Sequence, residues 1–122
     1  MNIICFGAHP DDCEFFAGGT AVKWVQRGDK VCFVSLTNGD KGHHEMSPEA
    51  LAERRRKESK MSAAIAEVES VILDCHDGEL CPTLELRRKV VDLIRTFEAE
   101  VVLTHRPNDY HPDHRYTSQL VQ

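Results

Sequence analysis

The chain has 122 residues, of which 41% are hydrophobic and 29% charged, with a formal net charge of -5 at pH 7. This length and composition are typical of one folded domain with a single core, and they exclude a disordered chain. The acidic balance argues against a nucleic-acid binder, which would show a basic stripe. No apolar run approaches the ~18 residues that span a bilayer, and the N-terminus lacks the pattern of a signal peptide, so we expect a cytoplasmic protein.

Short apolar runs alternate with helical patterns along the chain. We predict four strands, at residues 2–7, 30–36, 70–74 and 100–104. We predict four helices, at residues 21–26, 47–67, 83–97 and from 112 towards 122. Because this alternation is typical of a parallel sheet covered on both faces, we expect one α/β domain over residues 1–122, a Rossmann-like three-layer sandwich with a mainly parallel sheet.

Local signals refine two of these helices. Gly18-Gly19-Thr20 predicts a tight turn before the first helix, and Ser47-Pro48-Glu49 is typical of a helix start, with Ser47 as N-cap. The inward face of the second helix is predicted to consist of apolar residues, namely Leu51, Met61, Ala64, Ile65 and Val68.

His9, Asp11, Asp12 and Glu14 crowd into six residues directly after the first predicted strand. Three acids so close together repel one another, and a divalent cation is the simplest partner that makes such a cluster favourable. A complementary group, His111-Pro112-Asp113-His114, lies in the segment that follows the last predicted strand. Parallel sheets bind ligands at the carboxyl ends of their strands, so the two groups meet if the first and last strands are neighbours.

His9 and Asp12 lie three residues apart on a tight turn, and His114 supplies a third potential ligand. Two imidazoles and one carboxylate suit Zn²⁺ with one position open for water. They suit Fe²⁺ equally, so the ligand types leave the metal undecided. Such a site generates a reactive hydroxide near neutral pH, and we expect Asp11 to act as the general base towards that water.

His111 and Asp113 complete the expected chemistry. We expect His111, as a cation, to stabilise an oxyanion or to protonate a leaving amine, with Asp113 holding its imidazole charged and oriented. Each acidic or histidine-containing group alone also fits a structural role, a turn with an N-cap in one case and a helix start in the other. Their joint placement after two strands favours a functional site.

The other four histidines, His43, His44, His76 and His105, lie in loops without partner spacing. We interpret them as solvent-facing or hydrogen-bonding side chains. The chain also lacks a Gly-x-Gly-x-x-Gly turn after its first strand, and acids stand where a pyrophosphate would bind. This pattern argues against a dinucleotide site.

Taken together, the motifs resemble those of the PIG-L/LmbE-like metal-dependent N-deacetylases. The resemblance covers the chain from end to end and rests on Ala8-His9-Pro10-Asp11-Asp12-Cys13-Glu14, on Gly18-Gly19-Thr20 and on His111-Pro112-Asp113-His114. It implies removal of an acetyl group from an N-acetylglucosamine-type substrate. It also implies zinc ligands at His9, Asp12 and His114, a general base at Asp11, and stabilisation or protonation of the intermediate by His111 paired with Asp113.

The same resemblance implies substrate contacts at Arg55, Asp77 and Tyr110. Arg55 opens a segment similar to the family's Arg-x-x-Glu, and Asp77 opens one similar to its Asp-Gly-x-Leu, whose Asp binds sugar hydroxyls. Tyr110 lies in the segment before the second motif, where an aromatic or polar residue of the family lines the substrate pocket. Family members are usually nearly twice as long, so we expect the N-terminal portion of a longer fold, whose full-length form is a homo-oligomer.

Two other functions fit the same residues. One is a non-catalytic metal- or sugar-binding fragment, if the later half of the longer fold is needed for activity. The other is a different metallohydrolase such as a phosphoesterase, which would use further carboxylates to bridge two ions ~3.5–4 Å apart. Glu14 and Asp109 are the candidates for those carboxylates.

Overall fold

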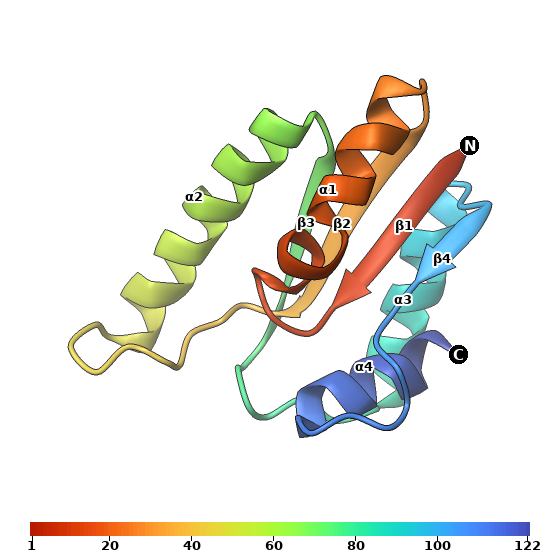
Figure 1. Ribbon diagram of the computed structural model, residues 1–122. Coiled ribbons are helices and arrows are strands. Elements are labelled where there is room, and N and C mark those ends of the chain that lie inside the picture. Colours follow the sequence, from red (N-terminus) through yellow and green to blue (C-terminus); the bar gives the residue numbers. More distant parts are fainter.

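A computed structural model describes residues 1–122 and shows a parallel sheet between two layers of helices (Figure 1). In chain order the elements are β1 (Asn2–Gly7), α1 (Asp12–Gln26), β2 (Lys30–Thr37), α2 (Pro48–Ala66), β3 (Glu69–Cys75), α3 (Leu84–Thr96), β4 (Val101–Leu103) and α4 (Pro112–Val121). The predicted α/β architecture is confirmed. None of the helices combines the length and apolarity that crossing a membrane requires.

The four strands lie in the order β3-β2-β1-β4. In the centre, β1 pairs in parallel with β2 on one side and with β4 on the other, so that Ile3 lies beside both Val31 and Val101. The strand order therefore reverses around β1, which makes the β1–β4 junction a switch point of the kind that binds ligands in α/β sheets. This confirms that the first and last strands are neighbours.

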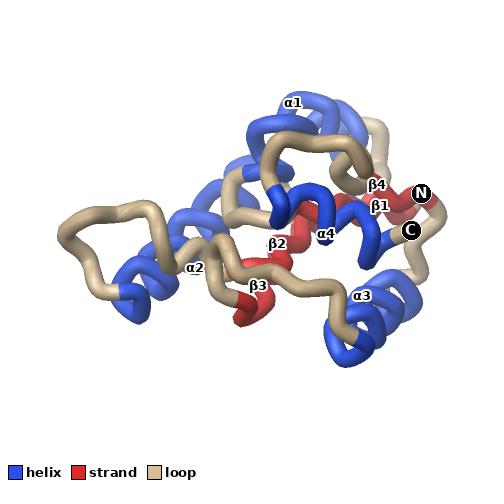
Figure 2. The backbone as a smooth tube through the Cα atoms, turned by 90° about the horizontal axis from the view of Figure 1, so that it is seen from below, coloured by secondary structure: helices blue, strands red, loops and turns tan.

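Alternate residues of the central strands supply two separate cores, as expected of a sheet covered on both faces (Figure 2). One core joins the sheet to α3 and α4, and its buried members include Ile4, Phe6, Val34, Leu36, Leu86, Val90 and Leu120. The other joins the sheet to α1, and its buried members are Ile3, Cys5, Cys13, Ala21, Val31 and Phe33. Full burial of one large aliphatic side chain contributes about 1.5–3 kcal/mol to the stability of the folded state. Both cores therefore help to hold the strands, and with them the loops at their carboxyl ends, in place.

The first helix begins earlier than its glycines suggest. It starts at Asp12, so Gly18 and Gly19 lie inside α1 and the predicted turn at these residues is wrong. The turn comes before them instead, because the Asp12 carboxylate accepts hydrogen bonds from the amides of Ala8 and His9. A glycine in a helix interior costs only about 0.5–1 kcal/mol relative to alanine, which the core beneath α1 offsets.

The start of α2 is confirmed, since the Ser47 hydroxyl accepts a hydrogen bond from the Ala50 amide. Its predicted inward face is only partly right. Leu51 is 1% exposed, but Met61 and Ile65 are 68% and 86% exposed. The buried positions of α2 are Leu51, Ala52, Ser59 and Ala63. Small residues therefore bring this helix against the sheet, and the large apolar residues near its C-terminus point to solvent.

Candidate metal centre

The loop between β1 and α1 brings His9 and Asp12 to the carboxyl edge of the sheet. Gly7 makes this possible, because a Cβ at that position would lie 2.7 Å from the Cβ of Asp12. The Asp12 Oδ2 atom accepts hydrogen bonds from the amides of Ala8 at 2.9 Å and His9 at 2.8 Å. The carboxylate is thus buried and held in place by the backbone that it organises.

His114, in the first turn of α4, approaches the same carboxylate from the other end of the chain. Its Nε2 atom lies 3.3 Å from Asp12 Oδ2, and His9 Nδ1 lies 3.5 Å from that oxygen. One ligand atom from each of these three residues lies within 4.8 Å of the other two. The structure therefore brings the predicted metal-ligand trio together, in the arrangement of three protein ligands that leaves a position for water.

Each histidine of this trio turns its second nitrogen to another carboxylate. His9 Nε2 is 2.9 Å from Asp113 Oδ2, and His114 Nδ1 is 3.1 Å from Asp109 Oδ1. Metal-ligating histidines commonly donate their remaining N–H to a carboxylate, which fixes the ring and its tautomer. The donor set around Asp12 therefore fits a divalent cation both in its ligands and in the groups behind them.

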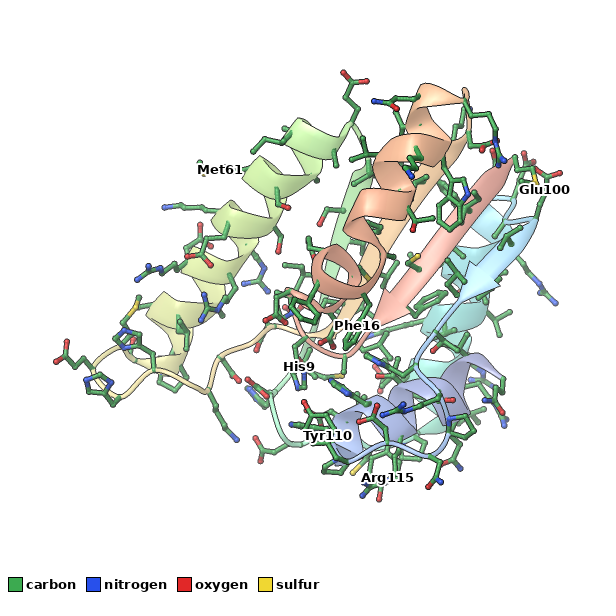
Figure 3. The ribbon with its side chains drawn as sticks, viewed as in Figure 1. His9, Phe16, Met61, Glu100, Tyr110 and Arg115 are labelled. Carbon is green, nitrogen blue, oxygen red and sulfur yellow. The ribbon has the colours of Figure 1, made fainter.

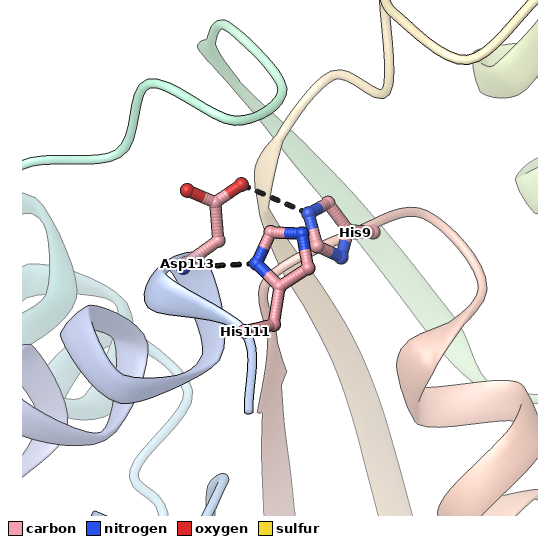
Figure 4. Close-up of side chains that lie close together, drawn as sticks. All are labelled: His9, His111 and Asp113. Atoms are coloured by element: carbon pink, nitrogen blue, oxygen red, sulfur yellow. Dashed lines mark hydrogen bonds and ion pairs between the residues drawn. The ribbon is translucent and has the colours of Figure 1, made fainter. Parts of the chain in front are cut away.

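Asp113 and His111 interact through the backbone rather than through the Asp113 carboxylate (Figure 4). The Asp113 amide donates to His111 Nδ1 at 3.0 Å, which leaves the proton of a neutral His111 on Nε2. The Asp113 carboxylate instead accepts from His9 and from the amides of Gly78 and Leu80. The Asp113 carboxylate, with hydrogen bonds from three donors, therefore holds His9 and the turn after β3 in place. The sequence predicted a contact of this carboxylate with the His111 ring, and the structure shows no hydrogen bond between them.

The charges of the cluster favour a bound cation. Burial lowers the pKa of His9, but three surrounding carboxylates outweigh it and raise that pKa to about 11. Burial opposes ionisation of Asp12, yet its contacts with His105 and His9 hold the pKa of this carboxyl well below its usual range. Burial lowers the pKa of His114, so this ring is neutral and ready to act as a ligand at pH 7. A metal ion at this point would replace the proton on His9.

His105 is part of the cluster, although the sequence pattern did not single it out. Its side chain is 8% exposed, and its Nε2 atom lies 3.1 Å from Asp12 Oδ2. Its ring stacks on that of His114, with centroids 3.9 Å apart. The interpretation of this residue as hydrogen-bonding is confirmed, but it does not face solvent as His44 and His76 do. His105 follows the end of β4 in the sequence just as His9 follows the end of β1, and this position could have indicated that it belongs to the site.

A cavity of about 580 Å³ opens in front of the trio and collects nearly all the predicted site residues. Eight of the nine line it, namely His9, Asp11, Asp12, Arg55, Asp77, Tyr110, His111 and His114. The ninth, Asp113, lies behind the cavity wall and is 1% exposed. Phe15, Phe16 and Tyr110 are exposed aromatic side chains on the same cavity, the first two of which were not predicted. Figure 3 shows Phe16 and Tyr110 near His9.

Asp11 differs from its neighbour Asp12 in its exposure and in its hydrogen bonds. It is the exposed N-cap residue of α1, and its side chain makes no capping hydrogen bond. Its carboxylate therefore stays available at the cavity, whereas that of Asp12 is used by the backbone and the histidines. Glu14, the other acid of the first motif, belongs to none of the three clusters of close ligand atoms in the structure.

A third buried acid, Asp40, lies in the loop after β2 and was not predicted. It is 4% exposed. Its Oδ1 atom accepts from the Asp77 amide at 3.0 Å, and its Oδ2 atom contacts His76 Nδ1. This contact joins the loop after β2 to the turn after β3, which carries Asp77 into the cavity.

The Asp40–His76 pair is expected to stabilise the fold over a limited pH range. Burial raises the pKa of Asp40, but His76 and the Asp77 amide outweigh it, so this pKa lies below its usual value. The contact with Asp40 raises the pKa of His76. The stabilisation from Asp40 is lost as the pH falls below about 4, and that from His76 is lost as the pH rises well above about 6.5. Thermal melts of the parent and His76→Ala should differ most between these limits and converge on both sides.

The parallel sheet and the carboxylate-backed trio at its switch point together define an α/β protein with a candidate single-ion metal centre. The family model described as PIG-L, GlcNAc-PI de-N-acetylase, matches residues 4–122. The chain therefore belongs to the PIG-L family, which confirms the resemblance seen in its motifs.

Known relatives and solved structures agree with this assignment. The chain is 39% identical over 125 residues to a diacetylchitobiose deacetylase of Thermococcus kodakarensis, covering 98% of the chain and 47% of that protein. Its fold matches N,N'-diacetylchitobiose deacetylase from Pyrococcus horikoshii with a TM-score of 0.90 and 34% identity, over 97% of the chain and 46% of that structure. The chain thus spans about half the length of these relatives.

A third match carries a different activity in its name. The 4-carboxy-2-hydroxymuconate hydratase GalB from Pseudomonas putida KT2440 matches with a TM-score of 0.92 and 25% identity. The match covers 100% of the chain and 55% of that structure. The solved structures that share this fold therefore include both a deacetylase and a hydratase.

Proposed function

We propose that the protein hydrolyses the acetamide of an N-acetylglucosamine-type substrate in a metal-dependent reaction. The observation that carries this proposal is the pairing of the His9–Asp12–His114 trio with a free Asp11 carboxylate on one cavity. The 39% identity to a diacetylchitobiose deacetylase supports the same reaction and substrate class.

In this proposal His9, Asp12 and His114 hold the ion, Zn²⁺ or alternatively Fe²⁺. When bound, the ion polarises the acetyl carbonyl and lowers the pKa of water. Asp11 takes a proton from the attacking water and later delivers it to the departing amine, so that acetate and a free amino group result. The Nε2–H of His111 donates a hydrogen bond to the carbonyl oxygen as it gains negative charge.

Arg55, Asp77 and Tyr110 are proposed to bind the sugar. All three line the cavity. Arg55 is held by Glu58, whose Oε2 atom accepts from its Nη1 atom at 2.7 Å. The carboxylate of Asp77 lies 3.2 Å from His9 Nε2, so it stands at the inner end of the cavity, beside the trio. Hydroxyl groups of a sugar would hydrogen-bond to these charged groups, while the exposed Tyr110 ring offers a flat apolar surface.

Acetate release is the direct test. The purified chain is stripped of metal, reloaded with Zn²⁺ or Fe²⁺, and incubated with N-acetylglucosamine and with N,N'-diacetylchitobiose. We expect acetate and a primary amine in equal amounts from the loaded chain and none from the stripped chain. A loaded chain that binds these sugars without releasing acetate would contradict the proposal and favour the non-catalytic binding alternative.

A hydratase is the second candidate, and the match to GalB favours it. The same Asp11 would then direct water to a carbon–carbon double bond instead of an acetyl carbonyl. Incubation with 4-carboxy-2-hydroxymuconate, followed by loss of its ultraviolet absorbance, separates the two reactions. Absorbance loss without acetate release from either sugar would replace the first proposal by the second.

A further inference from the structure

The loop after β2 contacts three other segments that build the cavity, namely the loop after β1, helix α2 and the turn after β3. Gly39 has φ +66°, a conformation that favours glycine. A Cβ at this position would lie 3.0 Å from Pro10 Cδ and 3.2 Å from Arg55 Cγ. The backbone of Gly39 is therefore packed tightly between the loop that carries the metal ligands and the helix that carries Arg55.

The next residue, Asp40, holds the third of these segments, the turn after β3. Its buried carboxylate accepts from the Asp77 amide at 3.0 Å and contacts the His76 ring. Further along the same turn, Asp113 accepts from the amides of Gly78 at 2.8 Å and Leu80 at 3.2 Å. Two buried carboxylates thus accept hydrogen bonds from successive parts of the turn after β3. Asp40 does so from the loop after β2, and Asp113 does so from α4.

Asp40 cannot act on substrate directly, since it does not line the cavity, whereas Gly39, Arg55 and Asp77 do. Its carboxylate reaches the cavity through Asp77, whose amide it holds. The His9 ring does not depend on that path, because Asp113 also holds His9 Nε2, at 2.9 Å. Loss of Asp40 would therefore disturb Asp77 more than the metal ligands.

We propose that the Gly39–Asp40 segment is the positioning element that sets Arg55 and Asp77 relative to the metal-binding loop. This assignment rests on the proposed function, because it makes the segment responsible for substrate binding in that reaction. Asp40 is the positioning residue, and Gly39 provides the close approach that allows its loop to reach both partners.

The kinetic test compares Asp40→Ala and Asp40→Asn with the parent, using the substrate that releases acetate. We expect KM to rise about tenfold in Asp40→Ala, with kcat within threefold and metal content unchanged. Asp40→Asn keeps one acceptor for the Asp77 amide and should recover part of the loss. The matched control is Asp74→Asn, because Asp74 lies on β3 shortly before the same turn and pairs with Arg56, and neither of these residues lines the cavity. This control should leave KM within twofold.

A structural readout keeps the test independent of turnover. In the metal-free chain, hydrogen exchange at the Asp77 amide should speed up at least tenfold in Asp40→Ala, while exchange at Gly78 and Leu80 should stay within threefold. Unchanged exchange at Asp77, or a fall in kcat with unchanged KM, would overturn the positioning role. Accelerated exchange in a chain that releases no acetate would contradict the proposed function alone and leave the Asp40–Asp77 linkage established.

Discussion

Asp11→Asn should bind metal like the parent and release acetate 10²–10⁴-fold more slowly. The substitution preserves the size and the N-cap position of the side chain but removes its capacity to accept a proton. General bases contribute rate factors of this order. Because Asp11 makes no capping hydrogen bond and is exposed, its loss should not disturb the fold or the trio. The measurements are kcat with N,N'-diacetylchitobiose, metal content by elemental analysis and the melting temperature.

Asp92→Asn is the matched control for that experiment, since Asp92 is exposed on α3, away from the cavity. It should leave kcat, metal content and melting temperature at the parent values. Parent-like turnover by Asp11→Asn would remove Asp11 from its role as general base. In that case His111, which also lines the cavity, would be the candidate to test.

The parts of the site that the sequence predicted are those with a local signal. His9 and Asp12 follow β1 directly, and the rule that parallel strands share a carboxyl edge placed His114 on the same edge of the sheet. The prediction required β1 and β4 to be neighbours, and the observed pairing of Ile3 with Val101 satisfies it. Ser47 likewise predicted the start of α2, because its hydroxyl caps the helix by accepting a hydrogen bond from the Ala50 amide.

What the sequence did not predict depends on contacts between distant segments. Asp40 and Asp77 are 37 residues apart, and His105 and Asp12 are 93 apart. The missed start of α1 has a local cause instead, since the turn that precedes it depends on the Asp12 carboxylate accepting hydrogen bonds from two nearby amides rather than on the glycines. The exposed Met61 and Ile65 show that apolar character did not decide which face of α2 packs on the sheet.

His114→Ala should abolish metal binding. The ring is 3% exposed, and its Nε2 atom is one of three ligand atoms within 4.8 Å, so truncation leaves only two ligands for the ion. We expect loss of stoichiometric metal after dialysis against metal-free buffer, together with loss of activity. Asp109 contacts the His114 ring from behind and is not one of the three proposed ligands, so Asp109→Asn should weaken affinity by a smaller factor, about 10–100-fold, the usual effect of removing a group behind a ligand.

His44→Ala is the control for this series, because that imidazole is 84% exposed in a loop outside the cavity. His105→Ala completes it, since His105 stacks on His114 and contacts Asp12 as closely as the predicted ligands do. The assignment of His114 requires that its loss be more severe than that of His105. Full metal content in His114→Ala, with loss in His105→Ala, would move the third ligand to His105 and leave His114 as the ring that packs behind it.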